Sequence, residues 1–354
     1  MNRTIIFTLL TLFCLGITGK TSQQVINVKA GDAESLLSAI EQANKQNADS
    51  AKAKWTFIMI PDGVYDLGER VLTTITGNRV ALIGESMAGT IIMNKPAVEN
   101  EGIGKTATLR NMGCDTYLQD LTLKNALDYY ATQSAGRAVC LQDKGTRTIC
   151  KRVCMLSYQD TYYSDNLTGQ MYMEDCEIHG TVDFICGPAD VYFNRCAIVT
   201  EPRNLDGSGN NVIAAPRTKG TSWGYIFESC TVFNIKSPFV YARGWQATPH
   251  CIWLNTTLKT PEKLKASRFD PSGMRTVQSD FKEYHTMDAD GNDITPKSNV
   301  ITFTLDDQKN TVETILTSEE AQKYQLKNIF PKWRPEKVLG KMAKKIEKLK
   351  QQSF

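Results

Sequence analysis

Two aspartates in this chain have a type and spacing that suit acid–base chemistry. Asp160 lies in the sequence Tyr-Gln-Asp-Thr, and Asp183 lies in Gly-Thr-Val-Asp-Phe. Two carboxyl groups held close together divide their roles, because like charges disfavour double ionisation and one group keeps its proton. If the fold brings the two segments side by side, the pair predicts a site with one carboxylic acid and one carboxylate.

A repeated pattern of alternating apolar residues supplies elements that would position this pair. The segments around Cys176, Cys196 and Cys230 each carry an apolar residue five and three places before the cysteine and two places after it. Weaker copies of the pattern centre on Leu121, Cys154 and Thr256. Alternation with period two predicts β-strands, and a β-patterned unit that recurs every 20 to 34 residues is typical of a β-solenoid.

We therefore expect an all-β fold, a single-stranded right-handed parallel β-helix with short capping helices at both ends. The absence of helical patterns between the predicted strands argues against a βαβ barrel. Equivalent positions would stack at about 4.8 Å per coil. Cys154, Cys176, Cys196 and Cys230 would then form an inward ladder. Buried free thiols are the favoured interpretation, because cysteine packs well as a small hydrophobe, and disulfides are the alternative.

The same stacking would bring the two aspartates to almost the same height. Asp160 follows Cys154 by six residues, and Asp183 follows Cys176 by seven. One coil repeat would separate their carboxyl groups by roughly 5–7 Å. The insertions 125–148 and 200–224 flank the pair and would form the walls of a cleft. Apolar faces suited to sugar rings come from Tyr158, Tyr162, Tyr163, Phe184, Tyr241 and Trp245.

Helical patterns occur only near the two ends of the chain. Residues 32–46 have amphipathic spacing, Thr317–Glu320 is a capping box, and residues 336–350 carry apolar residues at helical spacing among six lysines. The basic tail could contact an anionic surface, but a packed helix with a solvated lysine face is favoured. Since no linker divides the rest, we expect residues 20–354 to form a single domain with a helical C-terminal tail.

The first residues predict a secretory signal peptide over residues 1–19. Arg3 precedes an uncharged apolar run from Ile5 to Thr18, and small residues follow before Lys20. The run is too short to span a bilayer. We expect export to the periplasm or the cell exterior, without stable membrane insertion.

The charge balance and the histidine content narrow the classes of partner. A net charge of +3 on 354 residues argues against a nucleic-acid partner and against a disordered acidic chain. Only His179, His250 and His285 are present, which leaves little room for a multi-histidine metal centre. We expect no cofactor, no metal in the reaction, and a monomer.

At the two aspartate segments the sequence resembles the pectin methylesterase family, carbohydrate esterases built on a right-handed parallel β-helix. The family's Tyr-Gln-Asp-Thr motif is matched by Tyr158–Thr161, and its Gly-Thr-Val-Asp-Phe motif by Gly180–Phe184. The resemblance runs from about residue 30 to residue 260. It implies hydrolysis of methyl esters of galacturonate in methyl-esterified pectic polysaccharide.

The resemblance also implies roles for individual residues. Asp183 matches the nucleophile, Asp160 the general acid that then acts as general base, and Gln159 an oxyanion-hole glutamine. Arg243 and Trp245, in the sequence Tyr-Ala-Arg-Gly-Trp, match a motif that binds substrate and orients the nucleophile, although its first and third residues differ here. The candidate substrate-binding residues are Arg243, Trp245, Arg137, Tyr162 and Phe184.

Arg137 is the main departure from the family pattern. The family usually has an oxyanion glutamine at this position. Arginine can donate hydrogen bonds to an oxyanion or a uronate, but its reach and charge differ from those of glutamine. Arg137 is therefore expected to affect either the efficiency of hydrolysis on ordinary pectin or the choice of the best substrate.

Three alternatives share the predicted fold. A pectate-lyase-like protein would give unsaturated products in the presence of calcium, a non-catalytic solenoid would only bind pectin, and a relative could act on another ester or thioester. The intact aspartate pair with Gln159 argues against loss of catalysis.

Overall fold

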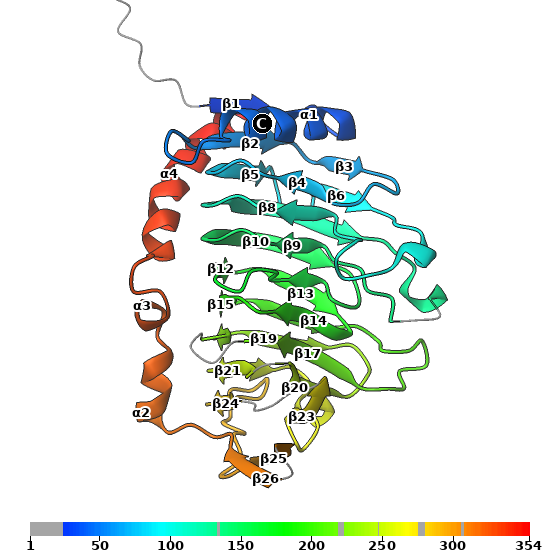
Figure 1. Cartoon of the computed structure of the whole chain (residues 1–354), viewed down its shortest axis with the longest axis vertical. Helices are drawn as coiled ribbons and strands as arrows, with labels where there is room; N and C mark the ends of the chain where they lie inside the picture. Colours follow the sequence, from blue (N-terminus) through cyan, green and yellow to red (C-terminus); the bar gives the residue numbers. More distant parts are fainter. Residues whose placement is uncertain (1–23, 133–134, 219–222, 247, 275–279, 306–307) are drawn as a thin grey trace, which may run out of the picture.

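The chain folds into a right-handed parallel β-helix whose coils stack along the long axis of the molecule (Figure 1). This computed structural model describes residues 24–132, 135–218, 223–246, 248–274, 280–305 and 308–354. Every strand pair between neighbouring coils is parallel among the described residues, and the antiparallel hairpin lies beyond the last coil. The predicted fold class is confirmed.

Each coil contributes strands to three rows, which we number 1 to 3. Row 1 contains β1 (Gln24–Asn27), β2 (Thr56–Ile60), β5 (Val80–Gly84), β8 (Tyr117–Asn125), β10 (Thr148–Leu156), β12 (Gln170–Glu174), β15 (Asp190–Asn194), β18 (Tyr225–Glu228), β21 (His250–Leu254) and β24 (Asp280–Tyr284). Row 2 contains β3 (Gly63–Asp66), β6 (Thr90–Asn94), the second halves of β8 and β10, β13 (Glu177–Gly180), β16 (Ala197–Thr200), β19 (Thr231–Asn234) and β22 (Thr257–Leu258). Row 3 contains β4 (Thr73–Ile75), β7 (Leu109–Asn111), β9 (Leu141–Asp143), β11 (Tyr162–Tyr163), β14 (Val182–Gly187), β17 (Asn211–Pro216), β20 (Phe239–Trp245) and β23 (Phe269–Met274).

The interior of the coils is filled by side chains that repeat from coil to coil. Phe193, Phe227 and Trp253 are register partners on β15, β18 and β21, and all three are fully buried. Their rings stack with centroids 4.4 and 3.9 Å apart. Parallel strands lie about 4.7–4.9 Å apart, so identical positions on successive coils meet face to face. In-register stacking therefore builds the core.

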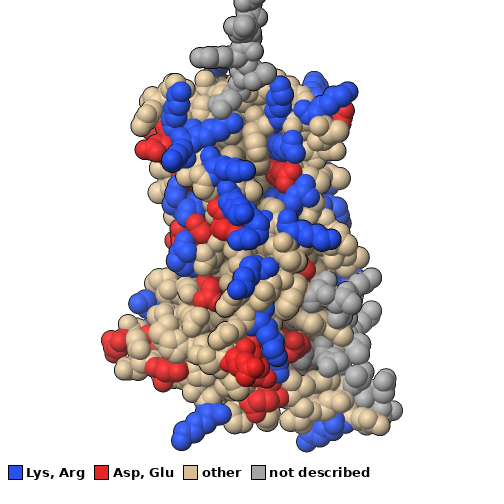
Figure 2. Space-filling model, turned by 90° about the vertical axis from the view of Figure 1, so that its left-hand side faces the viewer, with Lys and Arg blue, Asp and Glu red and all other residues tan. Residues whose placement is uncertain are grey.

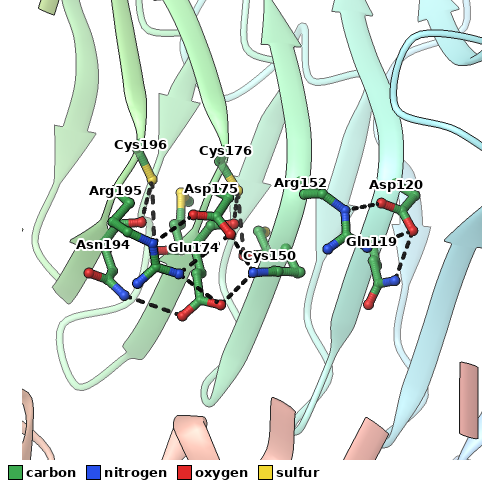
Figure 3. A network of polar contacts seen from close by, with 12 residues as sticks. Gln119, Asp120, Cys150, Arg152, Glu174, Asp175, Cys176, Asn194, Arg195 and Cys196 are labelled. Atoms are coloured by element: carbon green, nitrogen blue, oxygen red, sulfur yellow. Dashed lines mark hydrogen bonds and ion pairs between the residues drawn. The ribbon is translucent and has the colours of Figure 1, made fainter. Parts of the chain in front are cut away.

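The corner between rows 1 and 2 is held by residues with left-handed backbone conformation. Asp120, Arg152, Asp175 and Arg195 have φ between 49° and 56° on consecutive coils. Their charges alternate, and the guanidinium of Arg152 lies 2.5 Å from Asp120 while that of Arg195 lies 3.0 Å from Asp175 (Figure 3). A left-handed conformation costs a non-glycine residue about 1–2 kcal/mol. The ion pairs between neighbouring coils offset part of this cost.

The inward ladder that follows this corner differs from the predicted one at a single coil. Val153, rather than Cys154, is the register partner of Leu121, and the corresponding positions on the next coils hold Cys176, Cys196 and Cys230. Cys154 projects to the outer face because the side-chain direction alternates along a strand. All nine cysteines among the described residues are free, as favoured from the sequence, and eight of them are buried.

The two ends of the solenoid are covered by different elements. Helix α1 (Ala33–Gln46) begins at the N-cap Asp32 and buries Leu36, Ile40 and Ala43 over the first coils. At the opposite end lies the antiparallel hairpin of β25 (Val300–Leu305) and β26 (Gln308–Glu313) (Figure 1). Among the described residues, the short helix that was expected over this end lies at the side of the solenoid instead.

The C-terminal segment instead runs back along the side of the solenoid. It contains α2 (Ser318–Ala321) with the predicted capping box, α3 (Leu326–Ile329) and α4 (Pro335–Ser353), which ends beside β2 (Figure 1). The outer face of row 1 carries an apolar file in register, formed by Phe57, Ala81, Tyr117, Ile149, Tyr172, Tyr192, Ile226 and Ile252. Side chains of the segment cover this file, among them Phe330, Trp333, Met342, Ile346 and Leu349.

Most lysines of α4 face outward, as the packed-helix interpretation predicted. Lys337, Lys341, Lys344 and Lys348 are exposed. Lysine and arginine side chains gather on the face that Figure 2 presents, which is the side of the molecule along which the C-terminal segment runs. Lys350 instead donates to Asp120 at 2.6 Å, which joins the helix to the charged corner of the solenoid. The terminal helix is therefore held by apolar packing and by one ion pair at its far end.

The predicted signal peptide, residues 1–19, lies outside the described residues. Across the residues that are described, no helix has both the length and the apolar content needed to cross a membrane.

Removing one ring from the aromatic stack should destabilise the fold strongly. We expect Phe227→Ala to lower the free energy of unfolding by about 3–5 kcal/mol, because it leaves a cavity between two stacked rings. Phe233→Ala on the neighbouring strand is the matched control, since Phe233 is 40% exposed. Denaturant unfolding of both variants measures the difference. Equal losses in the two variants would contradict the stacking account.

Candidate active site

Asp160 and Asp183 occupy equivalent positions on consecutive coils. The register of β11 and β14 pairs Tyr162 with Ile185 and Tyr163 with Cys186. Counting back two places sets Asp160 opposite Asp183, and the amide N–H of Asp160 donates to the carbonyl of Val182 at 3.4 Å. Neighbouring parallel strands are about 4.7–4.9 Å apart. The structure thus brings the two predicted aspartates together at one corner of the solenoid.

Both aspartates have the left-handed backbone conformation. Their φ angles are 60° for Asp160 and 53° for Asp183, and the register between β14 and β17 shifts at Asp183. Bulges and left-handed residues are enriched next to functional sites because they redirect a side chain out of the regular alternation. Gly180 makes this turn possible, since a Cβ there would lie 2.1 Å from Cβ of Phe184.

Arg243 holds Asp183 through a bidentate ion pair. Its Nε and Nη2 donate to the two carboxylate oxygens at 2.8 and 2.5 Å. Asp183 is only 3% exposed, and Arg243 reaches it from β20, two coils further along. A planar guanidinium fixes the orientation of a carboxylate as well as its charge. The predicted contact between these two residues is present.

The two carboxyl groups are both buried, but different charges act most strongly on their pKa values. Burial raises the pKa of both, since charge is poorly solvated there. At Asp160 the negative charge of Asp183 raises the pKa further, to well above its usual range. At Asp183 the hydrogen bonds and charge of Arg243 oppose the effect of burial. The arrangement favours a protonated Asp160 beside an ionised Asp183.

Gln159 and Arg137 lie on neighbouring coils beside Asp160. They form an isolated parallel bridge, and Gln159 is 7% exposed with its Oε1 lacking a hydrogen-bond partner among the described residues. Arg137 donates through Nε and Nη2 to Glu101 at 2.9 and 2.6 Å. The positive charge of Arg137 lowers the pKa of Asp160, and the negative charge of Glu101 raises it. The arginine at position 137 is therefore paired with a carboxylate, Glu101, that offsets its charge. Glu101 was not identified from the sequence.

Three of the aromatic residues predicted to line the site are instead part of the core. Tyr162, Phe184 and Tyr241 have no exposed surface and belong to the main apolar cluster, where Tyr162 donates to Sδ of Met171 at 3.1 Å. The prediction that Tyr162 and Phe184 bind substrate was wrong. Their side chains point into the coil, because the alternation restarts after each left-handed aspartate.

Trp245 lies on the outer face of row 3, as its predicted role requires. Its ring is half-buried and packs 6.0 Å from that of Tyr163, and the guanidinium of Arg217 lies 5.6 Å above it. An aromatic face beside a cation suits an anionic sugar polymer. Arg217 could not be identified from the sequence, because it lies just after β17 and far from any recognised motif.

A second aromatic surface lies on the other side of the aspartate pair. Tyr158 stacks on Tyr129 with ring centroids 5.0 Å apart, and Tyr130 packs edge-on at 5.2 Å. The hydroxyl of Tyr130 donates to the carbonyl of Pro202 at 2.9 Å, so the two predicted wall insertions meet here. The three tyrosines line a pocket of about 380 Å³. The adjacent tyrosines within the first insertion were the signal that could have revealed it.

Replacing the ionisable carboxyl group of Asp160 by an amide should stabilise the fold at neutral pH. A group with a raised pKa in the folded state binds its proton more tightly there, so stability is lost as the pH rises above the ordinary value of 3.8. We expect Asp160→Asn to unfold at higher denaturant concentration than the parent at pH 7. The gain should grow by about 1.4 kcal/mol for each pH unit above 3.8 until the carboxyl group ionises in the folded state, and it should vanish below pH 3.8.

Asp290→Asn, in an exposed turn, controls for the loss of a carboxylate. A gain for Asp160→Asn that is the same at all pH values would contradict the electrostatic assignment.

Comparison with known proteins places this chain in a family. The pectinesterase family model matches residues 25–260. A pectinesterase/pectinesterase inhibitor of Ficus pumila var. awkeotsang is 29% identical over 206 residues, which cover 58% of this chain and 35% of the relative. The chain spans about a third to a half of the length of the curated relatives it matches.

Solved structures share the fold at low sequence identity. The pectin methylesterase PemA from Erwinia chrysanthemi matches with a TM-score of 0.68 and 23% identity, covering 89% of this chain and 99% of that one. The pectin methylesterase from carrot matches with a TM-score of 0.67 and 20% identity, covering 82% and 88%. With the family model matching most of the solenoid, the chain belongs to the pectinesterase family.

Proposed function

We propose that this protein hydrolyses methyl esters of galacturonate residues in pectin, releasing methanol and de-esterified pectate. The observation that carries the proposal is the stacked pair of Asp160 and Asp183, with Arg243 bound to Asp183 through both carboxylate oxygens. Family membership supports the reaction class. A solved structure similar in fold is that of a pectin methylesterase in complex with a hexasaccharide.

Asp183 would act as the nucleophile. An oxygen of its carboxylate attacks the ester carbonyl carbon, and negative charge develops on the carbonyl oxygen. The amide N–H of Gln159 would stabilise that charge. Asp160 donates its proton to the departing methoxy oxygen as the carbon–oxygen bond breaks, so that methanol leaves. An acyl-enzyme on Asp183 remains.

Asp160 would then reverse its role. As a carboxylate it accepts a proton from a water molecule that attacks the acyl carbon, which releases the galacturonate acid and regenerates Asp183. Arg243 would keep Asp183 oriented and would stabilise it as a leaving carboxylate. The rise in the pKa of Asp160 through burial and through the charge of Asp183 supports the protonated starting state.

The substrate would cross the aspartate pair between two aromatic surfaces. Trp245 with Arg217 lies on one side and the cluster of Tyr129, Tyr130 and Tyr158 on the other. Sugar rings pack on such apolar faces. We also propose that the chain is exported through residues 1–19, acts in the periplasm or outside the cell, and works as a monomer.

Replacing the nucleophile should abolish the reaction. We expect Asp183→Asn to release no methanol from methylated homogalacturonan above the uncatalysed rate, because the amide cannot form the acyl-enzyme. Circular dichroism of the variant would confirm an intact fold. Methanol release at the parental rate would rule out the assignment. Unsaturated products from the parent protein would indicate a lyase, and binding without any product would indicate a carbohydrate-binding protein.

The ion pair beside Asp160 should tune the pH profile in two opposite directions. Arg137→Gln removes a charge that lowers the pKa of Asp160, so the alkaline limb of kcat/KM should move to higher pH. Glu101→Gln removes a charge that raises this pKa, and the limb should move to lower pH. The double variant should return toward the parent profile.

Arg147→Gln is the matched control, because Arg147 forms a similar ion pair with Asp115 at a corner away from the site. Shifts of the same sign in both single variants would disprove the role of Asp160 as the titrating acid.

A further inference from the structure

Three side chains of different chemical type converge on the outer face of row 2. Cys154 lies on β10, and Glu177 and His179 lie on β13. One donor atom from each lies within 4.8 Å of the other two. Oε1 of Glu177 is 3.8 Å from Sγ of Cys154 and 2.7 Å from Nε2 of His179. None of these residues has a part in the proposed ester hydrolysis.

The register of the solenoid produces this convergence. Cys154 and Glu177 are direct partners in the pairing of β10 with β13. His179 lies two residues beyond Glu177, and alternate residues of a strand project to the same face. Since Val153 takes the inward position, Cys154 is free to join this outer group. A thiol, a carboxylate and an imidazole thus meet across two coils.

A fourth residue fixes the imidazole ring. Nδ1 of His179 lies 2.7 Å from Oε1 of Glu201, which directly follows β16 on the next coil. This contact directs Nε2 toward Glu177 and Cys154. Histidines that bind metal commonly hold a carboxylate with their other ring nitrogen, which sets the tautomer and the ring orientation. Glu201 has that position here.

The donor set suits a borderline transition metal. Zinc lies about 2.3 Å from sulfur, 2.0–2.1 Å from nitrogen and 2.0–2.2 Å from oxygen, which puts tetrahedral ligands about 3.3–3.6 Å apart. The sulfur–oxygen distance of 3.8 Å is already near that range, and the contact of Glu177 with His179 would open by a small side-chain rotation. Thiolate and imidazole favour zinc-like ions over calcium or magnesium.

The site also has an entry path. His179 and Glu201 line the pocket of about 380 Å³ that Tyr158 shares. Three protein ligands leave a fourth position for water, and the side chain of Glu177 is 38% exposed to solvent. We propose that Cys154, Glu177 and His179 bind a divalent ion of the zinc class, with Glu201 as the positioning residue. The ion would link two consecutive coils beside the aromatic surface, independently of the aspartate pair.

Titration of the metal-free full-length chain with Co²⁺ and Zn²⁺ tests this site. We expect one equivalent of Zn²⁺ to bind by calorimetry, and Co²⁺ to give the near-ultraviolet charge-transfer band of a cobalt–thiolate bond. Cys154→Ser should abolish the band, and His179→Gln or Glu177→Gln should weaken Zn²⁺ binding. Glu201→Gln should weaken it by about 10–100-fold while the band remains.

Matched controls come from residues of the same types outside the cluster. Cys114→Ser removes the one partly exposed cysteine among those described, and His250→Gln removes a half-buried histidine near Asp280. Both should leave the affinity and the band unchanged. Circular dichroism would verify the fold of each variant, and Glu177→Gln serves as the ligand variant if Cys154→Ser does not fold.

Either of two results would overturn the site. One is the absence of stoichiometric binding, which would mean that the cluster is only a hydrogen-bonded group. The other is a band that survives Cys154→Ser and disappears with Cys114→Ser. Because Asp183→Asn should bind Zn²⁺ as the parent does, the outcome is separate from that of the methanol assay.

Discussion

The in-register stacking of coils is the constraint on which the rest of this structure depends. It places Phe193, Phe227 and Trp253 ring against ring in the core. It also places Asp183 opposite Asp160 on the next coil, although the two residues lie 23 positions apart in the sequence. A shift by one residue would turn each of these side chains to the opposite face. Core packing and site geometry are therefore two consequences of one register.

The same stacking explains how charges are arranged along the molecule. At the corner between rows 1 and 2, acidic and basic residues alternate from coil to coil, and each is neutralised by its neighbour (Figure 3). At the candidate site the order is different, because Asp160 and Asp183 are acidic neighbours and Arg243 forms its bidentate ion pair with Asp183. Two like charges on adjacent coils are costly unless one group keeps its proton. The departure from alternation marks the site.

The sequence predicted the elements better than the side-chain directions. Period-two alternation identified the coils, and nearly equal offsets identified the aspartate pair, because both depend on spacing within one coil. Tyr162, Phe184 and Cys154 were assigned to the wrong face. Each follows a left-handed residue, where the alternation restarts, and counting from one anchor then fails. Residues that lie far apart in sequence, such as Glu101 opposite Arg137, have no local signal.

The path of the C-terminal helix along the solenoid also could not be predicted from the sequence. Its apolar spacing predicted a packed helix correctly, but the surface that receives it is a file of residues from eight strands, Phe57 to Ile252. That file exists only once the register is known. The residues of such a helix suit packing against an end of the solenoid and against its side equally well, so they do not indicate which of the two it covers.

A crystal structure of the Asp183→Asn variant with a methyl-esterified oligogalacturonate would test the central claim most directly. The account predicts an ester carbonyl carbon within about 3–3.5 Å of the side chain of residue 183, with the methoxy oxygen hydrogen-bonded to Asp160. An oligosaccharide whose esters all lie on another face of the solenoid would contradict it.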